Sequence, residues 1–215
     1  VPHARYLFDL KGIDPAIAAP LACSGLTTYG ALSRVREIAR REPIVLMGAG
    51  GLGLMCLGLL GAMGGKGAVV VDTDAHKREA ALAAGALAAI DGATPDAADQ
   101  IRAALGGQLY AVIDFVGNPA TAALGFDLLA KGGRLVLIGL FGGAAPWSLP
   151  MVPMKAITIE GCYVGNPRQL GELIDLVSGM ATPPLAIDRR PLDKVNEALH
   201  DLEQGRVLGR AVLLP

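Results

Sequence analysis

The chain has 215 residues, which is enough for one substantial core or for one domain with appendages. Its formal net charge of −1 at pH 7 gives no electrostatic reason to expect nucleic acid or an acidic membrane as a partner. Few aromatic residues and many small and aliphatic ones are typical of a sheet covered by helices on both faces.

The cysteines and the first residues bear on the cellular compartment. Cys23, Cys56 and Cys162 are odd in number and widely spaced, so we expect no disulfide framework. No signal peptide or transit segment is visible, which makes the reducing cytoplasm the expected location. The chain opens with Val1 rather than Met, so we expect either a processed terminus or a piece of a longer polypeptide.

Turn and helix signals divide the chain into short elements. Residues 1–21 contain several prolines and no regular period, so we expect an irregular lead-in with one helical turn at 14–19. Ser24 or Thr27 is expected to cap a helix that continues through Ala39. Further helices are predicted after a glycine-rich turn that follows residue 47, and at 75–84, 96–105, 120–130, 167–180 and 192–204. Strands are predicted at 44–47, 69–71, 86–90, 109–115, 134–138 and 156–162, with a loop at 140–153 and extended tail segments at 185–188 and 210–214.

The alternation of strands and helices predicts a parallel sheet with right-handed crossovers. We therefore expect an α/β fold of the Rossmann type, a doubly wound parallel sheet of about six strands with helices on both faces. Ligands of such sheets bind at the carboxyl ends of the strands, where the strand order reverses. Gly48, Gly117 and Gly139 follow predicted strands and would leave open space at this edge.

The segment 43–74 carries the strongest functional pattern. After the apolar strand, Gly48, Gly50 and Gly53 fit the G-x-G-x-x-G spacing. The first glycine permits a tight turn, the second lets backbone N–H groups approach a pyrophosphate, and the third lets the next helix pack closely on the sheet. Asp72 ends the following strand, where a carboxylate can accept the hydroxyls of an adenosine ribose and would repel a 2′-phosphate. The pattern predicts a binding site for NAD.

Other interpretations of this segment are weaker. A glycine-rich turn can join a strand to a helix without any ligand, and methyltransferases have a similar but looser loop. Residues 43–65 are uncharged and long enough to cross a bilayer, but their clustered glycines and the ordered α/β pattern that follows argue against a membrane span. We therefore expect no membrane partner.

A catalytic site is harder to find in the sequence. His76 and His200 fall on predicted solvent-exposed helices. No tyrosine is followed four residues later by lysine, which argues against the proton relay of short-chain reductases. Neither Cys-x-x-Cys nor His-Glu-x-x-His is present, so we expect that the chain cannot build a metal site alone.

Three stretches carry a family resemblance: LACSGLTTYGAL at 21–32, GAGGLG at 48–53 with Asp72 and Lys77, and LGRAVL at 208–213. Together they resemble the medium-chain dehydrogenase/reductase superfamily, and within it the zinc-dependent alcohol dehydrogenases. The resemblance implies that 1–22 is a lead-in remnant of the catalytic domain and that 23–215 is the dinucleotide-binding Rossmann domain with a C-terminal return segment. The chaperonin-like catalytic domain and most zinc ligands would be absent.

The resemblance also implies roles for individual residues. Cys23 matches a ligand of the catalytic zinc, although a buried cysteine at a helix start is more often part of a core. Thr27 matches the catalytic threonine that packs on the nicotinamide, and a helix-capping hydroxyl is its alternative role. The implied cofactor-binding residues are Gly48, Gly50, Gly51, Leu52, Gly53, Asp72, Thr73, Lys77, Val116, Gly117, Ile138, Gly139, Leu140 and Arg210.

The leading hypothesis is thus the NAD-binding portion of an oxidoreductase that transfers hydride between a small alcohol or carbonyl and the nicotinamide. Zinc would be a cofactor only of the full-length protein, and this chain alone would be inactive. Two alternatives remain: a zinc-free quinone or enoyl reductase of the same superfamily, and a non-catalytic nucleotide-binding module. A homo-oligomer is also expected, paired through the loop at 142–154 and the strand at 157–159.

Overall fold

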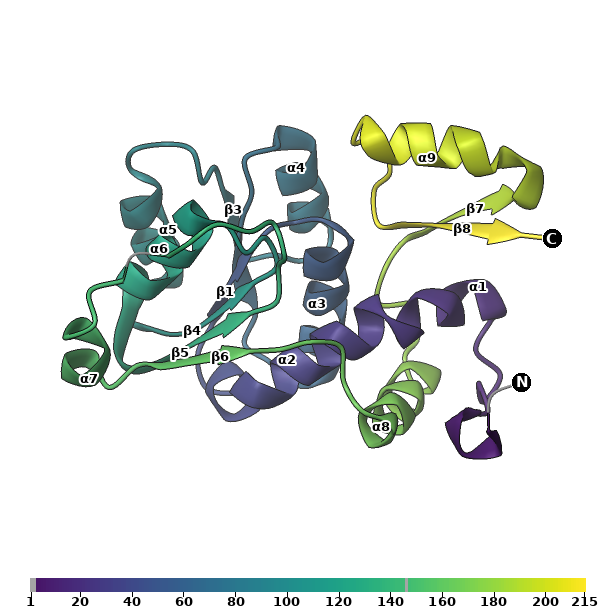
Figure 1. Cartoon of the computed structure of the whole chain (residues 1–215), viewed down its shortest axis with the longest axis horizontal. Coiled ribbons are helices and arrows are strands. Elements are labelled where there is room, and N and C mark those ends of the chain that lie inside the picture. The colour runs from purple at the N-terminus through teal and green to yellow at the C-terminus, as the bar shows by residue number, and fades with distance from the viewer. Residues whose placement is uncertain (1–2, 146) are drawn as a thin grey trace.

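The structure is a computed structural model that describes residues 3–145 and 147–215. A six-stranded parallel sheet in the order β3-β2-β1-β4-β5-β6 forms its centre (Figure 1). Its strands are β1 (Ile44–Met47), β2 (Ala68–Val71), β3 (Ala88–Ile90), β4 (Leu109–Asp114), β5 (Leu129–Leu137) and β6 (Thr158–Gly161). This is the doubly wound order, in which strands are added on one side of β1 up to β3 and on its other side from β4 onward. The predicted fold class is therefore confirmed.

Helices cover the sheet and extend beyond it at one end. They are η1 (Ala4–Tyr6), α1 (Pro15–Ala18), η2 (Ala19–Ala22), α2 (Ser24–Ala39), α3 (Gly51–Ala62), α4 (Ala75–Ala83), α5 (Ala97–Leu105), α6 (Pro119–Leu128), α7 (Met151–Lys155), α8 (Pro167–Ser178), η3 (Leu192–Lys194) and α9 (Val195–Glu203). In the described ranges, none of these helices has the length and apolar character that crossing a bilayer requires.

Alternation along β1 shows why helices are needed on both faces of the sheet. Ile44 and Leu46 join a cluster with apolar residues of α2, α3 and α8. Val45 and Met47 join a second cluster with residues of α5 and α6. All four side chains are fully buried. Because successive strand residues point to opposite faces, a strand that is apolar throughout folds only between two helical layers.

The start of α2 differs from the prediction. The helix begins at Ser24 with Cys23 at the N-cap position, and no side chain caps it. The Ser24 hydroxyl instead donates to the carbonyl of Pro20 at 2.9 Å. The 3₁₀ turn η2 ends at Ala22, so only Cys23 separates it from α2, and the Cys23 N–H donates to the Pro20 carbonyl at 3.4 Å. Neither Ser24 nor Thr27 is a cap.

The boundary between α6 and β5 also lies elsewhere than predicted. The helix ends at Leu128, and the strand begins at once with Leu129, which pairs with Leu109. The next pair joins Arg134 to Ala111, so residues 130–133 form an irregular bulge inside the strand. Lys131 and the two glycines after it had indicated a turn, whereas the buried Leu129 starts the strand early. The segment predicted as a loop at 140–153 also differs: α7 begins inside it, at Met151.

The two ends of the chain meet beside the main sheet. β7 (Ile187–Pro191) and β8 (Arg210–Leu214) form a separate two-stranded parallel sheet, connected through η3 and α9. This unit lies next to α1 and away from β3 to β6 (Figure 1). An ion pair joins Arg189 to Asp14 at 3.0 Å. The lead-in and the tail therefore pack on each other.

The N-terminus of α8 offers a test of local stability. The Asn166 side chain accepts the Gln169 N–H at 3.0 Å, and the Gln169 side chain accepts the Asn166 N–H at 3.1 Å. Asn166→Ala removes this capping box, and we expect the free energy of unfolding to fall by about 1 kcal/mol in urea titration. Arg168→Ala, in the same turn but largely exposed, should change it by less than about 0.5 kcal/mol. Equal losses in both variants would contradict the capping role.

Candidate dinucleotide-binding site

The turn between β1 and α3 brings backbone groups unusually close together. Gly48 has a φ of 97°, in the left-handed region that favours glycine, and its N–H donates to the carbonyl of Val71 at 2.7 Å. A Cβ on Gly53 would lie 2.0 Å from the Gly48 carbonyl oxygen. The turn thus requires glycine at position 48, and the close backbone contact requires glycine at position 53. They hold the start of α3 against the end of β1.

The first turn of α3 is open to a ligand. Gly50 occupies the N-cap position without any side-chain hydrogen bond, and a Cβ placed on it would meet nothing within 4 Å. The first N–H groups of a helix have no partner within the helix, and they carry the positive end of its dipole. An approaching phosphate could therefore accept hydrogen bonds from them. Leu52, in the same turn, is half-buried against the core.

Arg210 reaches this turn from the far end of the chain. A Cβ on Gly51 would lie 2.7 Å from Cζ of Arg210 and 2.8 Å from its Nε. The Arg210 guanidinium therefore lies directly over the second residue of the glycine pair. β8 begins at Arg210, whose N–H donates to the Ala186 carbonyl at 3.3 Å. A cation is thus added to the helix dipole at the point where a pyrophosphate would be held.

Asp72 is tied to the same turn by backbone hydrogen bonds. Its Oδ2 accepts the Ala49 N–H at 2.8 Å, and its Oδ1 accepts the Asp74 N–H at 2.9 Å. Arg78 donates to the backbone carbonyl of Asp72 at 2.9 Å and pairs with Asp91 at 3.3 Å. The carboxylate is therefore held in a fixed orientation at the end of β2. Each of its oxygens retains a lone pair for a further donor.

Asp74 is the N-cap residue of α4. Its carboxylate accepts the N–H groups of His76 at 2.8 Å and Lys77 at 3.3 Å. These backbone bonds, first that from Lys77, hold the pKa of Asp74 below its usual value. The cap fixes the first turn of α4, and with it the position of Lys77 beside Asp72.

A hollow of about 550 Å³ lies at the carboxyl ends of β1, β2 and β4. It is lined by five of the predicted cofactor residues, Gly48, Asp72, Thr73, Lys77 and Val116. Sequence patterns did not indicate several others that complete it, namely Gly92, Thr94, Asn118, Thr121 and Phe141. Phe141 is 81% exposed, which is unusual for so large an apolar ring. The size and the mixed lining suit a nucleoside.

The remaining predicted cofactor residues lie at the ends of β4 and β5. A Cβ on Gly117 would lie 2.0 Å from the Gly139 carbonyl oxygen, so these two loops touch through their backbones. Ile138 is buried, whereas Leu140 is 80% exposed. The structure therefore brings Val116, Gly117 and the segment 138–140 to one edge of the sheet.

Cys23 and Thr27 lie one helical turn apart at the start of α2, since the Thr27 N–H donates to the Cys23 carbonyl at 2.9 Å. Thr27 is buried, and Cys23 is exposed. Neither residue lines the 550 Å³ hollow. The other two thiols, Cys56 and Cys162, are buried, and burial raises the pKa of both. Residues 3–145 and 147–215 contain no group of three histidine, cysteine or acidic side chains placed to hold a metal ion.

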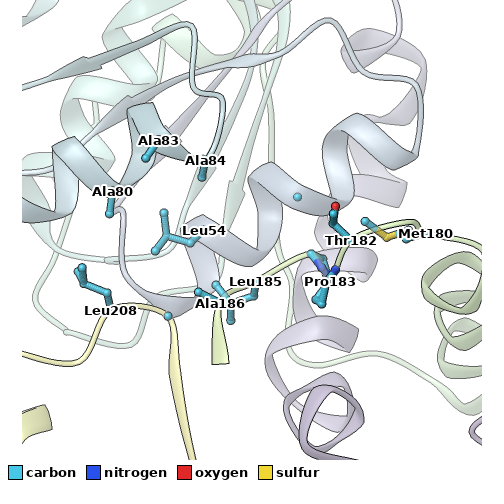
Figure 2. Close-up of a pocket in the computed structure, with 13 residues that line it drawn as sticks. Leu54, Ala80, Ala83, Ala84, Met180, Thr182, Pro183, Leu185, Ala186 and Leu208 are labelled. Atoms are coloured by element: carbon cyan, nitrogen blue, oxygen red, sulfur yellow. The ribbon is translucent and has the colours of Figure 1, made fainter. Parts of the chain in front are cut away.

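A second hollow, of about 510 Å³, lies on the other side of α3. Figure 2 shows Leu54 and the alanines of α4 facing Leu185, Ala186 and Leu208 across it. A Cβ on Gly58 would lie 2.1 Å from the Pro184 carbonyl oxygen, so the segment before β7 is pressed against α3 here. The hollow contains none of the predicted cofactor residues, and its largely apolar lining offers little to a phosphate.

The strand order, the glycine turn and the acidic residue at the end of β2 define this chain as a Rossmann-type α/β domain. A family profile described as zinc-binding dehydrogenase matches residues 51–179, and the chain belongs to that family. The predicted family resemblance is confirmed.

Longer proteins and structures of this kind resemble the chain over most of its length. The NAD-dependent alcohol dehydrogenase of Sulfurisphaera tokodaii is 32% identical over 216 residues, which cover 100% of this chain and 62% of that protein. The alcohol dehydrogenase of Aeropyrum pernix matches with a TM-score of 0.80 and 33% identity, covering 92% of this chain and 57% of the other. Acetophenone reductase from Geotrichum candidum, solved in complex with NAD, matches with a TM-score of 0.80 and 27% identity, covering 95% and 57%. The chain spans less than two thirds of the length of these relatives.

Two glycines of α3 make a matched pair of variants. Gly53→Ala would force a Cβ into the Gly48 carbonyl, so we expect it to destabilise the chain and to displace the turn. Gly61→Ala adds a methyl group where nothing lies within 4 Å, and it should stabilise the helix by about 0.5 kcal/mol. Thermal unfolding of both variants checks the opposite signs. A Gly53→Ala chain as stable as the parent would show that the close contact is not required.

Proposed function

We propose that this chain is the NAD-binding portion of an oxidoreductase that transfers hydride between an alcohol or carbonyl substrate and a nicotinamide cofactor. The observation that carries the proposal is the convergence of three groups at one turn. The open N–H groups of α3 and the Arg210 guanidinium face the place of a diphosphate, and Asp72 is oriented by a bond to Ala49 within that turn. The alcohol dehydrogenase relatives support it.

The individual residues then have distinct tasks. Gly48, Gly50, Gly51, Leu52 and Gly53 form the turn, while Thr73 and Lys77 line the hollow beside Asp72. Asp72 would accept the ribose hydroxyls and disfavour a 2′-phosphate, which selects NAD over NADP. Val116 and Gly117 would lie on the adenosine side, and the backbone of 138–140 would hold the carboxamide. Thr27 would pack on the nicotinamide.

Zinc is proposed only for the full-length protein. Cys23 is exposed at the start of α2, so its thiolate could serve as one ligand, while the others would come from outside this chain. When bound, zinc would polarise the oxygen of the alcohol or carbonyl substrate. Because Cys23 is the one candidate zinc ligand that we propose in this chain, we expect the chain to be inactive alone.

The contacts between the two chain ends support the domain division that we propose. Residues 1–22 and the β7–α9–β8 unit pack together beside the main sheet, and α9 leaves Leu199 and Leu202 more than half exposed. A two-stranded sheet rarely stands alone. We propose that 1–22 is the lead-in from a catalytic domain, that 23–215 is the nucleotide-binding domain, and that its return segment completes the catalytic domain of the longer protein.

Two further features concern assembly and location. β6 is an edge strand of the main sheet, and Leu149 and Met154 beside it are 79% and 68% exposed. We propose that two copies pair their sheets along this edge to make a homo-oligomer.

We also propose that the protein works in the cytoplasm, without a nucleic-acid or membrane partner.

Alternative functions make different predictions for the full-length protein. A zinc-free quinone or enoyl reductase would bind the nicotinamide cofactor and turn over without metal. A non-catalytic nucleotide-binding module would bind NAD without turnover of any alcohol or carbonyl.

Cofactor choice is tested at Asp72. We expect the wild-type chain to bind ADP-ribose more tightly than 2′-phospho-ADP-ribose in calorimetry. Asp72→Asn removes the charge that repels the phosphate, so the ratio of the two dissociation constants should shift toward the phosphorylated ligand by about tenfold. Asp74→Asn keeps the helix cap, because an asparagine oxygen can also accept the His76 and Lys77 N–H groups, and it should leave that ratio unchanged. Tighter binding of the phosphorylated ligand by the wild-type chain would refute the assignment of NAD.

Zinc ligation is tested in the full-length protein. Cys23→Ser replaces a soft thiolate by a poor zinc ligand, so we expect metal analysis to show a loss of zinc from one site per subunit. Cys162→Ser is the matched control, because this thiol is buried and donates only weakly to backbone carbonyls. A full-length protein that is active and contains no zinc would favour the zinc-free reductase.

A further inference from the structure

Asp114 is the last residue of β4 and is completely buried. Its Oδ1 accepts the N–H groups of Val116 at 2.8 Å and Gly117 at 2.9 Å. Its Oδ2 accepts the hydroxyl of Thr121 at 2.8 Å. One side chain thus shapes the loop between β4 and α6 and ties it to the first turn of α6.

The backbone of Asp114 holds the neighbouring loop as well. Its carbonyl accepts the N–H groups of Ile138 at 2.9 Å and Gly139 at 3.1 Å, just beyond the end of β5. The two loops then touch where Gly117 meets Gly139. Asp114 is therefore bonded to both loops that the proposed cofactor site uses, although it does not line the hollow itself.

The Asp114 side chain accepts hydrogen bonds from three donors, and none of them carries a charge. All three side-chain partners are neutral donors, which suits a carboxylate. No ion pair involves Asp114 within the described ranges 3–145 and 147–215. A buried charge without a cationic partner keeps much of its field, because the surrounding dielectric is low. That field extends to the sheet edge where the loops end.

We propose that Asp114 is a positioning residue for the dinucleotide site and that its charge raises the affinity for the oxidised nicotinamide relative to the reduced one. This inference rests on the proposed function. The oxidised ring carries a positive charge and the reduced ring is neutral, whereas the rest of the cofactor is the same in both. A negative charge behind the loops at 116–117 and 138–140 therefore acts on the difference between the two forms.

The decisive variant is Asp114→Asn, whose side-chain oxygen can still accept the Val116 and Gly117 N–H groups. The amide N–H of the new side chain can donate to the Thr121 hydroxyl oxygen. The Thr121 hydroxyl can then donate its own proton to the Asn118 carbonyl, which lies 3.2 Å away. The matched control is Thr121→Val, which removes the hydroxyl, with its bond to Asp114 and its contacts with Asn118 at the start of α6, and keeps the charge. NAD⁺, NADH and ADP-ribose are titrated calorimetrically into the 215-residue chain and both variants.

We expect Asp114→Asn to lower the affinity for NAD⁺ relative to the affinity for NADH by about fivefold. The affinity for ADP-ribose should change by less than about twofold. In Thr121→Val the affinities for NAD⁺ and NADH should fall together, with their ratio unchanged. An unchanged ratio in Asp114→Asn, or an equal change of the ratio in Thr121→Val, would overturn the inference.

Incomplete folding of a variant does not confuse this result. A smaller folded fraction lowers both apparent affinities by the same factor and leaves their ratio intact. Asp114→Ser serves as a second neutral variant and should shift the ratio in the same direction. If the wild-type chain failed to bind ADP-ribose at all, the proposed function itself would be refuted, and the inference would fall with it. Binding of ADP-ribose with no shift in the ratio would refute the inference alone.

Discussion

The contact between Gly53 and the carbonyl of Gly48 is the constraint on which the candidate site depends. A single Cβ at that point would lie 2.0 Å from a backbone oxygen, so α3 can start against β1 only if the position is glycine. This contact points the first turn of α3 at the sheet edge and leaves its N–H groups accessible. Gly117 and Gly139 make a comparable backbone contact at the next pair of strands. The edge is thus shaped by backbone atoms before any side chain contributes.

Charged side chains at this edge are held mainly by backbone groups. Asp72 accepts N–H groups from the turn after β1 and from its own loop, and Asp114 accepts N–H groups from the loop that follows it. Arg78 donates to the carbonyl of Asp72. Such bonds fix a charged group without neutralising it by a counter-ion. The Asp72 carboxylate can therefore accept further hydrogen bonds from a ligand, as the proposed function requires.

Local patterns in the sequence were sufficient for much of this arrangement. The spacing of Gly48, Gly50 and Gly53 and the acidic residue after β2 predicted the turn and its neighbours, because each depends on residues close in the chain. The contact of Arg210 with Gly51 could not be read from such patterns, since more than a hundred residues separate them, and only the family resemblance indicated it. Asp114 was missed because its strand reads as uniformly buried. No sequence pattern indicates that its carboxylate accepts hydrogen bonds from the loop that follows the strand. The early start of β5 was hidden for a similar reason, because its pairing with Leu109 is set by the neighbouring strand.

In the proposed function, the placement of Arg210 on the last strand ties diphosphate binding to the small two-stranded sheet. Within the described residues β8 pairs with β7 alone, and this small sheet has few partners beyond the lead-in segment. Units with so little buried contact open by local unfolding far more often than a central sheet does. Each such opening would withdraw the guanidinium from the helix terminus, and a bound diphosphate would oppose it. A bound diphosphate would therefore shift the opening equilibrium of the small sheet toward the closed state, and the tail would be better protected against hydrogen exchange as the site fills.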